Sequence, residues 1–222
     1  MSHQPSGLRV DAVPGAPWRN GGGVTRELLR WPGGGDDWRL RISVADIATD
    51  GPFSVFEGVQ RWITLLGGEG LALDFGGRSQ TLRPGDAPLA FDGGAPPHGR
   101  LLGGPVRDLN LMVRGGTGGM SACPTVPNGA RPAARQGEGT PMSATAAAVP
   151  WFAPSGAQAG LFARVAGRWS GAGDTRTLAA QSLLWFEEPP AGPWRFEPFA
   201  MHAAAPAPIG WWLHHLPVGP ST

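Results

Sequence analysis

The sequence contains no lysine and no tyrosine, has a single cysteine and carries almost no net charge. A formal charge of +1 excludes a globally basic nucleic-acid-binding protein, so we expect no nucleic-acid partner. Cys123 is the only cysteine, so no internal disulfide can form and a reducing compartment is compatible with the chain. No apolar run is long enough to span a bilayer and no secretory leader is visible, so we expect a cytoplasmic protein without a membrane partner.

What the chain has in abundance is glycine, proline and tryptophan, with 36, 24 and 10 residues. Glycine and proline interrupt it at short intervals, and the runs between them alternate apolar and polar residues, as half-buried strands do. No run carries a helical stripe. The predicted strands are Val24–Arg30, Trp38–Ala45, Arg61–Leu66, Leu71–Phe75, Pro88–Phe91 and Arg107–Arg114. Short strands separated by turn residues predict an all-β sandwich or barrel.

A change in composition divides the chain into two parts. Residues 115–150 are rich in glycine, alanine, proline, serine and threonine, a mixture that favours a loop or linker. We therefore predict an N-terminal domain over residues 1–120 and a C-terminal domain over residues 121–222. A weak internal repeat supports two related halves: Thr81–Leu82 and Leu89–Phe91 correspond to Thr177–Leu178 and Leu184–Phe186.

Several motifs of the first half carry a family resemblance. Leu65–Gly70 and the Pro84–Asp86 turn resemble the glycine turn and the Pro-Gly-Asp turn of a cupin. The chain is also similar to the HutD/Ves family through Trp18–Glu27, Trp38–Ala45, Gly51–Ser54, Phe91–Gly93 and Asp108–Met112, and more loosely through Leu184–Trp185 and Trp211–Trp212. The resemblance implies a bicupin with two jelly-roll (RmlC-like) antiparallel β-barrels, the second degenerate, and a link with bacterial histidine-utilisation genes.

The residues that could hold a metal or act as a nucleophile are few. None of the five histidines, His3, His98, His202, His214 and His215, forms a His-x-His motif, and adjacent His214 and His215 point to opposite faces of a strand. Cys123 has no histidine near it in the sequence, and no Gly-x-Ser-x-Gly elbow is present. We therefore expect no bound metal and no cofactor. Gly21–Gly23 lacks the lysine and helix of a phosphate loop and predicts a turn, or a close approach of ligand to backbone.

Alternation along three predicted strands places polar side chains together on one face. These sets are Thr25 and Glu27, then Arg39, Arg41 and Ser43, then Asp108, Asn110 and Met112. Two interpretations remain open. The polar faces meet water, or they line a barrel interior in which a small molecule binds.

Arg61 favours the second interpretation. It begins an apolar run and shares a face with Ile63 and Leu65, so an inward guanidinium needs an acceptor. If all the polar faces share one cavity, three arginines meet two carboxylates and a carboxylate ligand would satisfy the remaining guanidinium. The alternative is that Arg61 pairs with Glu57 or Asp108 and only orders the barrel. The predicted ligand-binding residues are Thr25, Glu27, Arg39, Arg41, Arg61, Asp108 and Asn110.

Three functions are compatible with these residues. The first, which we favour, is a metal-free, non-enzymatic bicupin that binds a small anionic metabolite. The family resemblance implies that this is urocanate or a formyl- or formimino-glutamate, in a regulatory or protective role. The second is an enzyme acting on such an intermediate, with Glu27 or Asp108 as general base and Arg61 as substrate clamp. The third is a structural or stress-related interaction protein without a ligand. A homodimer is compatible with all three.

Overall fold

Four antiparallel β-sheets make up the protein in the computed structural model, which describes residues 7–124, 148–200 and 208–218. The helical content of these residues is one short 3-10 turn, η1 (Val10–Ala12). The all-β prediction is thus confirmed. Each of the six predicted strands is present, with ends displaced by at most two residues. Among the described residues, no helix is long and apolar enough to cross a membrane.

The first half of the chain forms a large sheet and a small sheet that face each other. The six-stranded sheet has the order β2 (Ala16–Pro17), β3 (Gly23–Trp31), β4 (Leu40–Ile47), β11 (Val106–Arg114), β6 (Val59–Gly67) and β9 (Leu89–Asp92). The four-stranded sheet has the order β5 (Gly51–Pro52), β10 (His98–Leu101), β7 (Leu71–Asp74) and β8 (Ser79–Leu82). Ile63 and Leu65 of the large sheet pack against Leu71, Leu73 and Leu82 of the small one.

The second half repeats this arrangement. Its five-stranded sheet has the order β1 (Leu8–Arg9), β16 (Ser182–Phe186), β13 (Gln158–Ala163), β18 (Gly210–Leu216) and β12 (Thr117–Cys123). Its three-stranded sheet has the order β15 (Asp174–Leu178), β14 (Gly167–Gly171) and β17 (Arg195–Pro198). The core between these sheets is aromatic, with Trp169, Trp194, Phe196 and Trp212 all buried.

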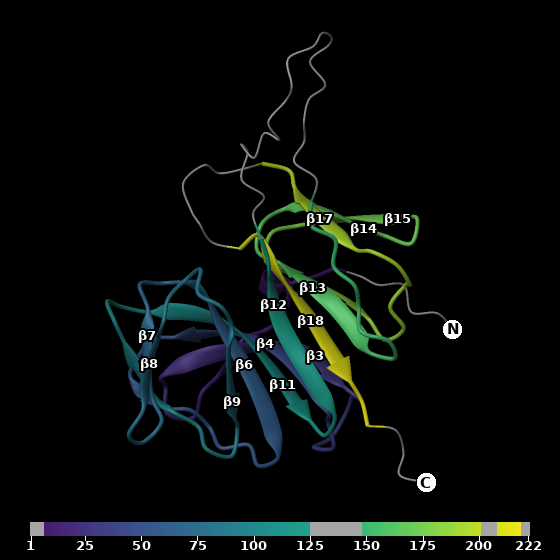
Figure 1. The fold of residues 1–222 in the computed structure, drawn as a ribbon. Coiled ribbons are helices and arrows are strands. Elements are labelled where there is room, and N and C mark those ends of the chain that lie inside the picture. The colour runs from purple at the N-terminus through teal and green to yellow at the C-terminus, as the bar shows by residue number, and fades with distance from the viewer. Residues whose placement is uncertain (1–6, 125–147, 201–207, 219–222) are drawn as a thin grey trace.

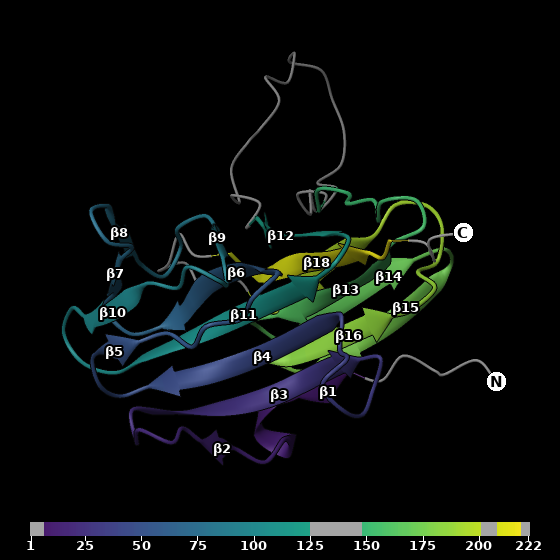
Figure 2. The ribbon, with the colours of Figure 1, turned by 90° about the horizontal axis from the view of Figure 1, so that it is seen from below.

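The two large sheets pack on each other, so the molecule has four layers of four, six, five and three strands. Leu40, Ile42 and Leu111 of the six-stranded sheet meet Phe162 and Trp211 of the five-stranded sheet in one buried cluster. Figure 1 shows the two small sheets on opposite sides of the molecule, and Figure 2 shows the long strands of both large sheets together.

The weak sequence repeat corresponds to a repeat of topology. The orders β4-β11-β6-β9 and β10-β7-β8 of the first half match β12-β18-β13-β16 and β17-β14-β15 of the second. Leu82 and Leu178, which marked the repeat, end the matching strands β8 and β15. Within the described residues each half is an open pair of stacked sheets, and none of the four sheets closes on itself into a barrel.

The change from one half to the other lies at Gly115 and Gly116, which precede the predicted boundary between residues 120 and 121. That boundary would cut β12, whose seven residues all pair with β18. Both glycines have positive φ, 65° and 88°, and a Cβ on Gly116 would collide with the carbonyl oxygen of Leu216. Composition placed β12 in the linker because it is built largely from small residues.

Candidate functional site

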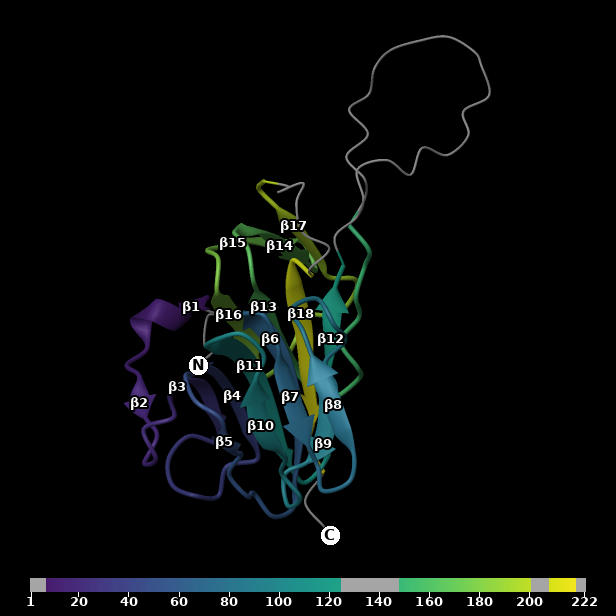
Figure 3. The same cartoon turned by 90° about the vertical axis from the view of Figure 1, so that its left-hand side faces the viewer.

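Apart from Arg39, the polar side chains predicted to face a barrel interior lie on the inner face of the six-stranded sheet, the face that packs on the four-stranded sheet. Strand register places Asn110 beside Ser43 and Ile63, and Met112 beside Arg41 and Arg61. The alternate residues of these strands pack toward the second half. Figure 3 views the molecule from the side of β7 and β8, the strands that cover this inner face.

Arg61 is the buried cation of this face. Its residue surface is only 5% exposed, and its Nη1 donates a long hydrogen bond of 3.4 Å to the Ser54 carbonyl, while its Nε has no partner. The Cζ atom lies 5.0 to 5.7 Å from the ring centroids of Phe53, Phe56 and Phe91. Burial lowers the pKa of Arg61 to about 10, and nearby Asp108 partly offsets this.

Asp108 and Asn110 are the buried acceptors of the same face. They are 2% and 8% exposed, and in each the Oδ1 atom is buried without a hydrogen-bond partner. Burial raises the pKa of Asp108 to about 7, although the charge of Arg61 and a hydrogen bond with the Ala45 backbone lower it. Neither an ion pair nor a hydrogen bond links the described side chains of Arg61 and Asp108, and none links Arg61 to Glu57.

Glu27 and Thr25 lie on β3 with their polar atoms already engaged. The Glu27 carboxylate accepts a 2.7 Å hydrogen bond from Arg41 Nε and two bonds from Arg30, of 2.8 and 3.0 Å. Burial would raise the pKa of Glu27, but these two arginines lower it. Thr25 Oγ1 accepts a 2.7 Å hydrogen bond from Trp18 Nε1. Arg41 also stacks on Trp38, with 5.1 Å between its Cζ and the ring centroid.

Arg39 does not join this cluster. Strand β4 begins at Leu40, so the alternation that would place Arg39 beside Arg41 does not extend to it. Its side chain is exposed and lies near Gly115, at the turn into β12. The charge count that predicted one arginine without a partner, three arginines against two carboxylates, therefore changes. Glu27 is shared by Arg30 and Arg41 at the partly exposed edge. Arg61 and Asp108 are the two buried charged residues of this face, and no ion pair links them.

The sequence interpretation missed the phenylalanine side chains around Arg61. Phe53 and Phe56 lie in the loop after β5, where no strand alternation fixes a direction. The motif Gly51–Ser54, which helped to establish the family resemblance, was the signal available for two of these contacts. It supplies both the Phe53 ring and the Ser54 carbonyl.

The described strands of the second half have no equivalent of this polar face. Its inward positions on β13 and β18 hold Ala159, Leu161 and Trp212, and Trp212 stacks on Trp151 with 5.2 Å between the ring centroids. Trp194 lies beside these two rings, with 6.2 Å between its ring centroid and that of Trp212. Aromatic side chains therefore occupy the region that corresponds to the Arg61 site.

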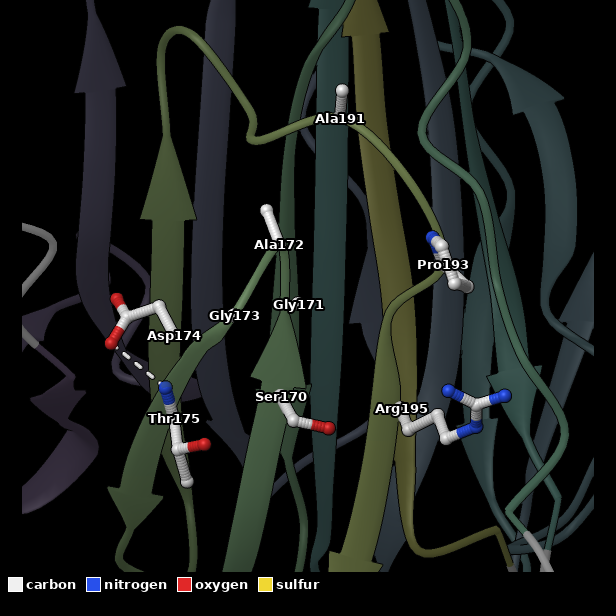
Figure 4. Close-up of a pocket in the computed structure, with 9 residues that line it drawn as sticks. All are labelled: Ser170, Gly171, Ala172, Gly173, Asp174, Thr175, Ala191, Pro193 and Arg195. Carbon is white, nitrogen blue, oxygen red and sulfur yellow. Dashed lines mark hydrogen bonds between the residues drawn. The ribbon is translucent and has the colours of Figure 1, made fainter.

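A hollow of about 370 Å³ lies on the outside of the second half, at the β14–β15 hairpin. Figure 4 shows its nine lining residues, with Ser170 and Thr175 on the hairpin, Ala191 and Pro193 on the loop before β17, and Arg195 extending away from the hairpin. No buried polar side-chain atom of these nine residues lacks a partner. Unlike the inner face, the hollow therefore has no unsatisfied buried polar atom that a ligand would satisfy.

Metal-ligating and thiol groups do not form a site in the described part of the chain. No three His, Cys, Asp or Glu side chains there are grouped to hold a metal ion. His98 is exposed on β10, and His215 is buried between the halves with its Nδ1 3.2 Å from Gln158 Oε1. His3 and His202 lie outside the described residues, so the absence of a metal stays a prediction. Burial raises the pKa of Cys123 to about 12, which makes it an inert thiol.

Comparison with curated proteins identifies relatives of part of the chain. An uncharacterised 21.2 kDa protein in the hutC 3' region of Pseudomonas putida is 47% identical over 107 residues. Protein Ves of Citrobacter koseri is 39% identical over 107 residues. Each match covers 47% of this chain and 56% of the relative, so the chain spans about half the length of these relatives.

Solved structures match nearly the whole chain. A conserved protein of unknown function from Pseudomonas aeruginosa is 29% identical with a TM-score of 0.74, covering 97% of this chain and 100% of its own. HutD from Pseudomonas fluorescens is 24% identical with a TM-score of 0.67, covering 96% and 98%. Ylba from Escherichia coli, with 7% identity and a TM-score of 0.60, covers 96% of this chain and 91% of its own and is similar in fold alone.

The family model named HutD matches residues 11–198, which include the strands from β2 to β17. The match covers most of the chain and agrees with the shared fold of the P. fluorescens protein. This protein therefore belongs to the HutD family.

Proposed function

We propose that the protein binds a small carboxylate at Arg61, on the inner face of the six-stranded sheet. The observation that carries the proposal is the group of buried polar atoms without partners: Arg61 Nε, Asp108 Oδ1 and Asn110 Oδ1. Buried polar groups in native proteins are almost always satisfied, so three unsatisfied atoms on one face indicate a missing partner. A carboxylate is the natural acceptor for a guanidinium, and it would replace the long bond to Ser54.

The histidine-utilisation link narrows the ligand class. The P. putida relative is named for its position beside hutC, and the P. fluorescens structure bears the name HutD. We therefore propose urocanate or a formyl- or formimino-glutamate as the ligand, in a regulatory or protective role. These molecules carry carboxylates for Arg61. They also carry N–H groups, which suit the free oxygens of Asp108 and Asn110. We take the two halves as cupin-like units of which only the first keeps a site.

The test is thermal unfolding with added formylglutamate or urocanate. The wild type should be stabilised by at least one of them, by about 2.7 kcal/mol when the ligand is at 100 times its Kd. Arg61→Met, which keeps most of the side-chain volume, and Arg61→Ala should show no shift. Arg195→Ala removes a guanidinium beside the outer hollow and is the matched control, which should shift like the wild type. Equal shifts in wild type and both Arg61 variants would disprove the proposal.

An enzyme acting on the same intermediates is the second candidate, and one observation favours it. The pKa of Asp108 is raised to about 7, which is where a general acid or base works best near neutral pH. Glu27, the other candidate base, is held ionised by Arg30 and Arg41 and has no free geometry for that role. Turnover of formylglutamate or urocanate that is lost in Asp108→Asn would favour the enzyme over the binding protein.

A further inference from the structure

We propose that Asp108 takes up a proton when a carboxylate binds at Arg61, so that ligand binding and protonation are coupled at this site. The inference rests on the proposed function and adds its regulation. Its basis is that Arg61 and Asp108 are both buried on one face, each with a polar atom that has no partner, and that a ligand carboxylate would share the guanidinium whose charge acts on Asp108. The proton comes from solvent and forms one O–H bond on Asp108, and no other covalent bond changes.

Among the described residues, Arg61 on β6 is the cation that acts on Asp108, and Asp46 on β4 acts on it as an anion. From the four-stranded sheet, Leu71, Leu73 and Leu82 pack against this face. Glu27 on β3 and Arg41 on β4 form an ion pair with each other. The charge of Arg41 affects Arg61, whose pKa it lowers. A bound carboxylate would therefore leave an uncompensated buried negative charge unless one anion is neutralised.

Protonation of Asp108 removes that excess charge. The carboxyl is fully buried, and its raised pKa, about 7, means that protonation near neutral pH requires little free energy. The new O–H group can donate to the ligand carboxylate or to the free Oδ1 of Asn110, so one proton satisfies a buried acceptor as well. The neutral carboxyl, the Arg61 guanidinium and the one ligand carboxylate bound to it then carry no net charge together.

The experiment is titration calorimetry with formylglutamate, whose carboxyl groups stay ionised between about pH 6 and pH 9. The Kd of the wild type should rise about tenfold for each pH unit above the titration of Asp108, because one proton is taken up per ligand. Calorimetry in two buffers of different ionisation enthalpy should give an uptake of about one proton in that range. Asp108→Asn should bind the ligand with a Kd that does not change with pH.

Asp46→Asn is the control for a carboxylate that is near Asp108 and engaged by Arg26 and Arg107. It should keep the pH dependence of the wild type. A wild-type Kd that is flat over this range, or an equal slope in Asp108→Asn, would overturn the coupling. If binding is still lost in Arg61→Met, the proposed function would survive that result. No saturable binding by the wild type at any pH would overturn both.

Discussion

At the scale of single residues, Asp108 makes the free energy of unfolding of the protein depend on pH. Burial raises its pKa from the usual 3.8 to about 7 in the folded state. The folded protein therefore keeps a proton that the unfolded chain has already lost. Stability decreases as pH rises from about 4 to about 7 and is constant above that range, as far as this group is concerned. Glu27 and Asp46 have lowered pKa values and act in the opposite direction, at lower pH.

Asp108→Asn should remove this loss of stability. We expect the variant and the wild type to have similar free energies of unfolding near pH 4. At pH 8 the variant should be more stable by an amount on the order of 4 kcal/mol, the equivalent of a shift of about three pKa units. Urea unfolding at about pH 4, 6 and 8 measures the difference between the two proteins, in which the shared carboxylates cancel. Parallel pH profiles would show that Asp108 has an ordinary pKa.

Sequence alternation identified the most important residues of the site and misplaced one. Arg61, Asp108 and Asn110 lie inside strands β6 and β11, where a period of two fixes which face a side chain takes, and the register shift between β11 and β6 comes just before Asp108. Arg39 lies one residue before β4, where that period does not yet apply. Alternation also says nothing about which atoms are engaged. The sequence could not show that Thr25 bonds to Trp18 or that Glu27 is shared by two arginines.

At the scale of strands, the existence of six strands could be predicted from the sequence, but the pairing between strands could not. The six predicted strands have clear apolar and polar faces, which local sequence records directly. The pairing of β1 with β16 and of β12 with β18 joins residues far apart in the chain, and no local pattern encodes it. β12 was assigned to the linker because Gly118, Gly119 and Ala122 bury little apolar area.

Strand β11 should be the element most sensitive to a cavity. It pairs with β4 on one side and β6 on the other, and its residue Leu111 is 0% exposed in the cluster between the two large sheets. Leu111→Ala should lower the free energy of unfolding by about 2 to 5 kcal/mol. Val55→Ala removes methyl groups from a residue that is 58% exposed and should change it by less than about 0.5 kcal/mol. Chemical denaturation measures both, and similar values would mean that the sheets are not tightly packed there.

At the scale of the whole molecule, the same strand order serves two different purposes. In the first half the inner face carries buried polar side chains with unsatisfied atoms beside an apolar core, and in the second half tryptophan side chains fill the corresponding space. The halves are not independent, because β1, from the start of the chain, pairs with β16 and completes the five-stranded sheet of the second half. The buried cluster between the large sheets adds a second connection.

We therefore expect the protein to unfold as one unit. Calorimetry should show a single transition whose calorimetric and van't Hoff enthalpies agree, because separating the halves exposes Leu111, Phe162 and Trp211. Fragment 121–222 should not fold alone, since it lacks β1 and part of β12. A split between Gly116 and Thr117 keeps β12 whole, so fragments 1–116 and 117–222 produced together should co-purify and unfold cooperatively. Two well-separated transitions in the intact chain, or a stable fragment 121–222, would show instead that each half holds its own core without the other.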